Sequence, residues 1–506
     1  TLMCKLFGEE NLSTLTSLSN LAYTCGNLGN YQKQLELNEK AYALRCKVLG
    51  EKNPETLISL NNLACSYNNL GDYQKQLEIA KKVYTLRCEV LGKKNPDTLH
   101  SLSNLAYTYG NLGDYQKQLE LNEKAYRLKC EVLGEKNPST LISLSNLAGT
   151  YGDLGDYQKQ LELNEKAYAL SCEVLGEKHP NTLISLSNLA AAYGNIGDYQ
   201  KQLELAEKAY ALRCEVLGEE NPDTLTSLNN LADTYGILGD YQKQLELNEK
   251  AYTLRCEVLG EKNPETLTSL MSLAGTYRNL SNHKKQLELT EKTYMLRCEV
   301  LGEKNPNTLT SLNNLAYIYG ELGNYQKQLE LNEKVYTLMC EVLGEKSPAT
   351  LISMNNLACA YGNLGNYQKE LELDEKAYAL GCEVLGEKNP DTLISLNNLA
   401  NTYSNLGNHQ KSLELNEKAY PLICEVLGEK HPNALTSLSN LAYTYVALDN
   451  HQKAAELFLK LYAHQCEVFG EDDDETLSTL RNLANSYEHL GETDKAAEIR
   501  ARIENL

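Results

Sequence analysis

The sequence predicts an all-α fold, a solenoid of stacked helix-turn-helix hairpins, and three observations lead to it. A segment of 42 residues recurs along the whole chain of 506 residues without insertion or deletion. Within each copy, apolar residues recur at the spacing of two α-helices, and no stretch shows the alternation of a strand. A fixed period of this length is typical of repeat proteins, in which each unit buries its apolar face against its neighbours.

The motif Asn-Leu-Ala marks the register of the repeat, with Ser272 in place of asparagine in one unit. The asparagines are Asn20, Asn62, Asn104, Asn146, Asn188, Asn230, Asn314, Asn356, Asn398, Asn440 and Asn482. We therefore divide residues 12–506 into twelve repeats and take residues 1–11 as the tail of a truncated preceding repeat. The repeats are 12–53, 54–95, 96–137, 138–179, 180–221, 222–263, 264–305, 306–347, 348–389, 390–431, 432–473 and 474–506, the last being a C-terminal cap repeat.

The first helix of each unit is illustrated by the repeat 222–263. Asn221 can cap the helix while Pro222 takes its first turn. One side of the predicted helix carries the apolar residues Leu225, Leu228, Leu231, Ala232 and Tyr235. The other side carries Thr226, Asn229, Asn230, Asp233 and Ile237. Because the apolar side must meet the partner helices, we expect the second side to form one continuous free face along the stack.

The second helix follows a tight turn. Gly239 permits a positive φ, and Asp240 can cap the helix that begins at Tyr241. Its apolar residues recur at helical spacing as far as Leu259, and Gly260 is a stop signal. Each unit is therefore predicted to be a helical hairpin.

The charge of the chain limits the classes of partner. The net charge is −20 and the pI is about 5.0, and the acidic excess is spread over most units. Since phosphate binding needs a basic stripe, we do not expect a nucleic acid partner. No apolar run is long enough to span a bilayer and no signal peptide is visible, so we expect a cytoplasmic protein with no membrane contact. The chain opens inside a hairpin without an initiator methionine, which indicates a fragment of a longer protein.

Fifteen cysteines are present, and twelve of them fall in the repeat register. Equivalent positions of stacked hairpins should lie about 10 Å apart, whereas a disulfide requires Cα atoms within about 7 Å. We therefore expect small buried thiols in a reducing compartment, with a redox or metal-binding role as the alternative. No metal site, cofactor or catalytic residue is predicted, because the eight histidines are scattered and accompany no catalytic motif.

Three parts of the unit match a known repeat: Leu228 to Tyr241, Ala251, and the junction Leu259 to Thr266. On these residues the unit resembles the tetratricopeptide repeat (TPR), in the 42-residue form of kinesin light chains and nephrocystin-like proteins. The resemblance implies a right-handed superhelix whose first helices line a concave groove. Two columns of the second helix depart from the family, with glutamine for alanine (Gln244) and asparagine for an aromatic residue (Asn248).

The eleven asparagines of the Asn-Leu-Ala motif are the first candidates for a binding site. In arrays that this chain resembles, this position lines the groove and hydrogen-bonds the backbone of an extended peptide. An amide suits that role because it donates and accepts at once. The alternative is that these side chains bond to the neighbouring hairpin and only set the repeat geometry.

Specificity candidates lie three residues after each asparagine, where the sequence varies inside an otherwise uniform array. They are Tyr23, Tyr107, Asp233, Tyr317, Asn401 and Tyr443, and drift at a tolerant position is the alternative. Arg278, in the irregular seventh repeat, lies at the edge of the free face and could meet a carboxylate. The alternative there is decay of one repeat. Pro421 falls inside a second helix and predicts a bend near residues 415–421.

Together these features predict a non-enzymatic scaffold, expected to be a monomer, that binds a peptide or protein segment in the groove. The resemblance implies a cargo-adaptor role like that of kinesin light chains, whose ligands carry an aromatic residue flanked by acids. Few lysines or arginines lie on the predicted groove, which argues against that ligand class. The alternative is the sensor or scaffold arm of a larger protein with an N-terminal effector domain.

Overall fold

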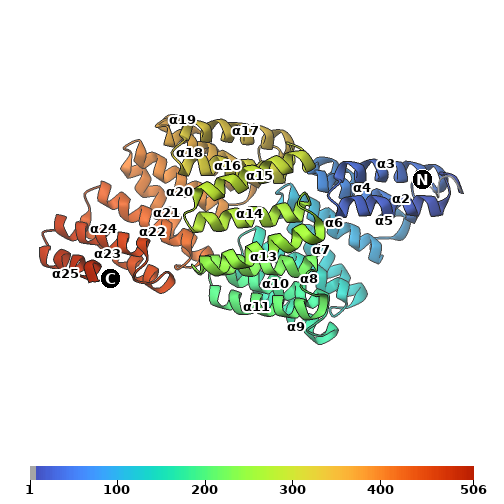
Figure 1. Cartoon of the computed structure of the whole chain (residues 1–506), viewed down its shortest axis with the longest axis horizontal. Coiled ribbons are helices and arrows are strands. Elements are labelled where there is room, and N and C mark those ends of the chain that lie inside the picture. Colours follow the sequence, from blue (N-terminus) through green and yellow to red (C-terminus); the bar gives the residue numbers. More distant parts are fainter. Residues whose placement is uncertain (1–6, 506) are drawn as a thin grey trace.

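The protein is an extended stack of helical hairpins (Figure 1). The computed structural model describes residues 7–505, which form 24 helices and contain no strand. The predicted all-α solenoid is therefore confirmed. The first helices of the hairpins are α2 (Leu12–Asn27), α4 (Pro54–Leu70), α6 (Pro96–Asn111), α8 (Pro138–Asp153), α10 (Pro180–Asn195), α12 (Pro222–Ile237), α14 (Pro264–Asn279), α16 (Pro306–Glu321), α18 (Pro348–Asn363), α20 (Pro390–Asn405), α22 (Pro432–Ala447) and α24 (Asp474–His489).

Each first helix is followed by a second helix of the same hairpin. These are α3 (Tyr31–Leu49), α5 (Tyr73–Leu91), α7 (Tyr115–Leu133), α9 (Tyr157–Leu175), α11 (Tyr199–Leu217), α13 (Tyr241–Leu259), α15 (His283–Leu301), α17 (Tyr325–Leu343), α19 (Tyr367–Val384), α21 (His409–Leu427), α23 (His451–Val468) and α25 (Thr493–Asn505).

The predicted capping residues begin the helices in the structure. The side chain of Asn221 accepts a hydrogen bond from the backbone N–H of Asp223 at 2.9 Å, and Asp240 accepts one from the N–H of Lys243 at 2.9 Å. These bonds satisfy amide groups that a helix start leaves without an intrahelical partner. Gly239 has a φ of +82°, which explains why glycine is needed at the turn.

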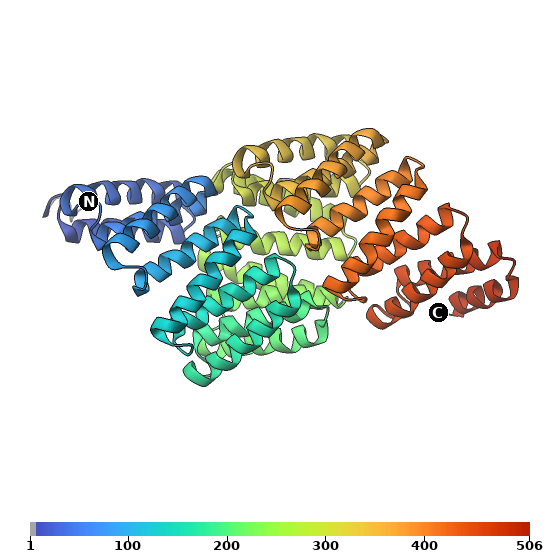
Figure 2. The ribbon, with the colours of Figure 1, turned by 180° about the vertical axis from the view of Figure 1, so that it is seen from behind.

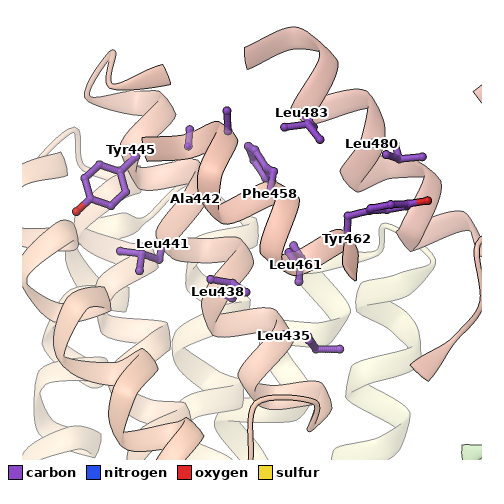
Figure 3. Close-up of a cluster of buried hydrophobic side chains, with 12 residues drawn as sticks. Leu435, Leu438, Leu441, Ala442, Tyr445, Phe458, Leu461, Tyr462, Leu480 and Leu483 are labelled. Carbon is purple, nitrogen blue, oxygen red and sulfur yellow. The ribbon is translucent and has the colours of Figure 1, made fainter. Parts of the chain in front are cut away.

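The core runs along the stack as a series of clusters between neighbouring hairpins. Near the C-terminus, Leu438 of α22, Phe458 of α23 and Leu480 of α24 are buried in one such cluster (Figure 3). In α12 the leucines and the alanine of the predicted apolar side are buried and Tyr235 is half-buried, but one residue of the predicted free face is also buried. Asn229 donates to Oδ1 of Asn248 at 2.8 Å and accepts from Ser269 of the next repeat at 2.8 Å. The expectation for Asn229 was wrong because these bonds satisfy its amide inside the stack.

The cysteines of residues 7–505 are all free thiols. Those in the repeat register are half-buried rather than fully buried, so the expectation of a buried thiol ladder was too strong. Cys65 and Cys359 are exposed. Cys4 lies outside the described residues.

The first helices lie on the inner side of the curved stack. Within residues 7–505, the substantial contacts between helices two apart in the sequence all join first helices, such as α8 with α10 and α12 with α14. Elements on the inside of a curve lie closer together than elements on the outside. The free face of the first helices is therefore the concave surface of the molecule.

Successive turns of the superhelix touch each other. The side-chain amide of Asn263 donates to the carbonyl oxygen of Asn27 at 3.2 Å, and that of Asn305 donates to the carbonyl of Asn69 at 3.3 Å. Asn389 donates in the same way to Asp153 at 3.1 Å. Each pair is 236 residues apart, so one superhelical turn takes about 5.6 repeats of 42 residues.

The contact between turns also brings hairpin glycines against prolines. A Cβ atom added at Gly29 would lie 2.6 Å from Cδ of Pro264. Gly71, Gly113 and Gly155 meet Pro306, Pro348 and Pro390 in the same way. Tyrosines that begin the adjoining second helices, such as Tyr73 and Tyr157, pack against hydrophobic clusters of the next turn.

The contact ends before the last two repeats. A Cβ built on Gly197 would have no atom within 4 Å. At the junction where the series would next continue, His431 replaces asparagine. Figures 1 and 2 show the C-terminal helices α22 to α25 extending to the end of the molecule opposite the N-terminus.

Pro421 lies inside α21, which continues on both sides of it; the bend stays a prediction. A proline inside a helix removes a hydrogen bond and costs about 3 kcal/mol or more. Replacing Pro421 with alanine should therefore raise the free energy of unfolding of this part of the stack by roughly 1–3 kcal/mol, measured by hydrogen exchange. The reverse change one repeat earlier, Ala379→Pro, should lower it. Equal stability of P421A and the parent chain would contradict this account.

Candidate functional site

The asparagines of the Asn-Leu-Ala motif lie on the concave surface, as part of the free face of the first helices. None of the eleven is fully buried, and Asn20, Asn146 and Asn230 are exposed. Their positions follow from the helical spacing, because the neighbouring leucine and alanine of the motif, such as Leu231 and Ala232, point into the core. The motif therefore places an incompletely buried amide on this face in eleven of the twelve repeats.

Some of these amides also bond to a neighbouring hairpin. Nδ2 of Asn104 donates to Oδ1 of Asn61 at 2.9 Å, and Nδ2 of Asn356 donates to Oδ1 of Asn313 at 3.1 Å. Asn482 donates to the hydroxyl of Tyr443 at 2.7 Å. An amide that donates one such bond keeps further hydrogen-bonding capacity. The structure thus shows contact between repeats for some of these asparagines, and the role of the column in binding a peptide stays a prediction.

Cavities lie beside several asparagines. One of about 230 Å³, between α10 and α12, is lined by Asn230 and Asp233. Another of about 190 Å³, between α8 and α10, is lined by Asn146 and Asn188. A larger one of about 700 Å³ is lined by Asn62 of α4 and by residues of the next superhelical turn. The surface that carries these asparagines therefore has recesses between neighbouring repeats and between successive turns.

The specificity candidates differ in their surroundings. Tyr107 is exposed, and Tyr23 is exposed beside the cavity of about 700 Å³. Arg278 of α14 lies over the ring of Tyr317 of α16, with its guanidinium carbon 5.8 Å from the ring centroid. This arrangement permits a cation–π interaction between two of the predicted residues. Asn401 is exposed on α20.

Asp233 and Tyr443 are exposed as well, but each also interacts with neighbouring helices. The surrounding helices desolvate the carboxyl group of Asp233 and raise its pKa to about 6. The ring of Tyr443 meets that of Phe458 edge to face at a centroid distance of 5.4 Å. Tyr443 is consequently tied to the second helix behind it, as well as to Asn482.

Exposed isoleucines are a feature of this surface that the sequence analysis missed. Ile142 and Ile184 are 48% and 51% exposed, and they line the cavity of about 190 Å³. Ile58, Ile352 and Ile394 occupy equivalent positions and are also exposed. Several other repeats have threonine at this position, as at Thr226. This variation between isoleucine and threonine is the signal in the sequence that could have identified the position. Apolar residues on an otherwise polar face are suited to contact a partner.

Two acids in the ninth repeat, the half-buried Glu370 and the buried Asp374, were also missed. Glu370 stands where most repeats have glutamine, and Asp374 stands where many have asparagine. Burial raises the pKa of Glu370 to about 7, with a further contribution from the nearby charge of Asp374. Burial likewise raises the pKa of Asp374 to about 6, although the hydroxyl of Thr402 donates to it at 2.6 Å.

Comparison with known proteins supports the repeat assignment. The tetratricopeptide repeat family matches residues 13–89, 97–173, 139–215, 197–257, 223–294, 308–383, 371–425 and 391–467. A solved structure from Podosopora anserina, described as a candidate kinesin light chain with nearly identical TPR-like repeats, is 30% identical. The match covers 40% of this chain and 95% of that one, with a TM-score of 0.36. BtubC (BKLC) from P. vanneervenii is 22% identical over 46% of this chain and 92% of its own, with a TM-score of 0.38.

No curated protein matches the chain. Within residues 7–505, no helix is both long and apolar enough to cross a lipid bilayer.

A stack of helical hairpins with one accessible, mostly polar concave face defines a protein-interaction scaffold. The chain belongs to the tetratricopeptide repeat family, whose matches cover well over half of its length. Its irregular positions, Arg278 and Tyr317 among them, lie on the concave face shared by all repeats.

Proposed function

We propose that the chain binds an extended segment of a partner protein along its concave surface. The observation that carries this proposal is that the recurring asparagines remain accessible in the groove, with cavities beside Asn146, Asn188 and Asn230. Amides at a regular spacing can donate to and accept from the backbone of a peptide, whose own groups need partners when they leave water.

Affinity would come from the recesses between these amides. Ile142 and Ile184 offer apolar contact, while Asp233 supplies a carboxylate at the adjoining cavity. Tyrosines such as Tyr107 are suited to act as anchors because they combine a large apolar area with a hydroxyl group. The backbone contacts would then be common to many ligands, and the variable positions would select among them.

The test uses two triple variants of the intact chain. In the first, Asn146, Asn188 and Asn230 are replaced by alanine. In the matched control, three exposed amides of second helices, Gln200, Gln242 and Gln326, are replaced by alanine. A partner is captured with the parent chain, and its binding segment is then titrated against all three proteins.

We expect the concave variant to bind the segment at least about 10-fold more weakly, since hot-spot residues each contribute more than about 1 kcal/mol. The control should bind like the parent chain, and circular dichroism should show equal helicity for all three. Unchanged affinity of the concave variant would contradict the proposal.

The identity of the partner separates two narrower roles. A cargo-adaptor role of the kinesin light chain kind requires that the captured segment belong to a transported protein or its adaptor. A role as the sensing arm of a larger protein requires instead that binding of the segment change the activity of a domain linked to the array.

A further inference from the structure

A column of buried cations runs through the first part of the stack. Six second helices place an arginine or lysine at equivalent positions, 42 residues apart or a multiple of it. These residues are Arg45, Arg87, Lys129, Arg213, Arg255 and Arg297, and each is at most 7% exposed. Burial lowers the pKa of each of them. In the fourth repeat the same position is occupied by Ser171.

Each buried cation donates to oxygen atoms that the repeat supplies in fixed places. The first is the hydroxyl of a serine on the next first helix, as for Arg87 with Ser101 at 2.8 Å. The second, found for Arg87, Lys129, Arg255 and Arg297, is a backbone carbonyl near the start of that helix, as for Arg297 with Asn307 at 2.9 Å.

Further acceptors come from the preceding first helix. Arg213 donates to the hydroxyl of Ser187 at 2.9 Å and to the carbonyl of Leu183 at 3.1 Å. The guanidinium group is thus held between two successive first helices by uncharged oxygens alone in some repeats, as at Arg297.

The repeat with Ser171 keeps these acceptors but lacks the cation. Ser185, Asn181, Ser145 and Leu141 occupy the equivalent acceptor positions, and all four line the cavity of about 190 Å³ between α8 and α10. Ser171 lies at the base of this cavity and is 1% exposed. Its hydroxyl is 3.4 Å from that of Ser185, so a short side chain leaves the space of the missing arginine unfilled.

Three of the four other repeats without the cation do not leave such a space. Met339 and Ile423 occupy the position with apolar side chains and are buried in hydrophobic clusters. At Gly381 the neighbouring helix comes close, because an added Cβ would lie 3.0 Å from Oγ1 of Thr392. The exception is the eleventh repeat, where Gln465 holds the position and lines an equivalent cavity of about 440 Å³, with Thr436 and Ser478 in place of the two isoleucines.

We infer that the cavity over Ser171 is a binding site for a basic side chain of the ligand, an arginine in the first instance. The ligand guanidinium would take the place that arginine takes in the neighbouring repeats and donate to the same kinds of oxygen. Its planar fork of five N–H donors matches several acceptors at once. The net charge of −20 favours approach of a basic segment.

The position of the cavity connects it with the concave surface. Asn146, Asn188, Ile142 and Ile184 form its rim, so a segment that lies along the asparagines passes over its opening. This inference rests on the proposed function, because it names one side chain of the segment that would bind there.

The test measures the methyl NMR signals of the five exposed isoleucines during titration with acetyl-arginine amide. Binding of a single residue is expected to be weak, on the order of millimolar. The signals of Ile142 and Ile184 should shift. Ile58, Ile352 and Ile394 are internal controls, because the equivalent space is filled or closed beside each of them. The position of Ser171 is occupied by Arg87 next to Ile58 and by Ile423 next to Ile394, and the neighbouring helix closes it at Gly381 next to Ile352. Acetyl-citrulline amide, which has nearly the same shape without the charge, should produce shifts that require at least about a 10-fold higher concentration.

Two variants make the test specific. Ser171→Arg supplies the missing guanidinium from the chain itself and should abolish the shifts. Arg87→Ser recreates the cavity two repeats earlier and should add Ile58 to the signals that respond. If S171R does not fold, the double change Ser145→Ala with Ser185→Ala removes two acceptors and should weaken the response.

Equal shifts of all five isoleucines, or no shift of Ile142 and Ile184, would overturn the inference. So would an undiminished response in S171R. If the probe fails in this way while the concave asparagine variant still loses its partner, the proposed function stands without the arginine site. If both S171R and the concave asparagine variant still bind the partner like the parent chain, the proposed function itself is contradicted.

Discussion

Replacing Gly29, Gly71, Gly113 and Gly155 together with alanine is expected to separate the two turns of the superhelix. At each position an added methyl group would collide with the ring of a proline from the next turn, and a rigid ring on a helix start has little freedom to move. The four contacts form a continuous seam, so the collisions act together. Small-angle X-ray scattering should show a larger radius of gyration and a longer maximum dimension than for the parent chain.

The chain offers a matched control for the local effect of these changes. Gly197, Gly239, Gly323 and Gly365 have similar positive φ angles, between +75° and +82°, but an added Cβ at any of them would meet nothing within 4 Å. An alanine in this conformation costs about 1–2 kcal/mol wherever it is placed. Both quadruple variants should therefore lose local stability, and only the first should expand. Equal dimensions of the two variants would contradict the described contact between turns.

Replacing Glu370 with glutamine and Asp374 with asparagine is expected to stabilise the ninth repeat at neutral pH and to remove a pH dependence. Burial raises the pKa of these carboxyl groups to about 7 and about 6, above the usual values near 4 of an unfolded chain. Between those values the folded state binds more protons than the unfolded state. Stability of the parent chain should therefore fall as the pH rises from about 4 to about 7, and level off above that.

The expected fall is roughly 3 kcal/mol, since one pKa unit corresponds to about 1.4 kcal/mol. Most of it should come from the fully buried Asp374, because solvent screens the half-buried Glu370. Hydrogen exchange of α19 and α20 at pH 5 and pH 8 measures the upper part of this fall, of which Asp374 contributes about 1.4 kcal/mol. Glu372→Gln, which removes an exposed carboxylate from the same helix, is the control and should retain the pH dependence. A parent chain equally stable at both pH values would show this account to be wrong.

The sequence contained enough information for the fold of one hairpin. The period, the caps Asn221 and Asp240, and the glycine of the turn are local signals, and α12 and α13 begin and end where they predict. The apolar face of α12 was also predictable from spacing. Asn229 was not, because its burial depends on partners on α13 and on the next repeat that a helical wheel does not include.

The contact between turns was beyond sequence reasoning for a geometrical reason. Asn263 and Asn27 are 236 residues apart, and they meet only because small rotations between successive hairpins add up to one closed turn. The candidate site could also be predicted only in part from the sequence. Its asparagines are placed by helical periodicity, whereas the cavity at Ser171 becomes visible only when the column of cations and its acceptors is seen in space.

The central claim, that the concave face of the first helices is the binding surface, is tested most directly by site-specific photo-cross-linking. A photoreactive side chain is placed at position 188 or 230, on first helices, or at position 200 or 242, on second helices. The account predicts that the partner segment is captured from positions 188 and 230 and not from 200 and 242. Capture from 200 and 242, with none from 188 and 230, would contradict it.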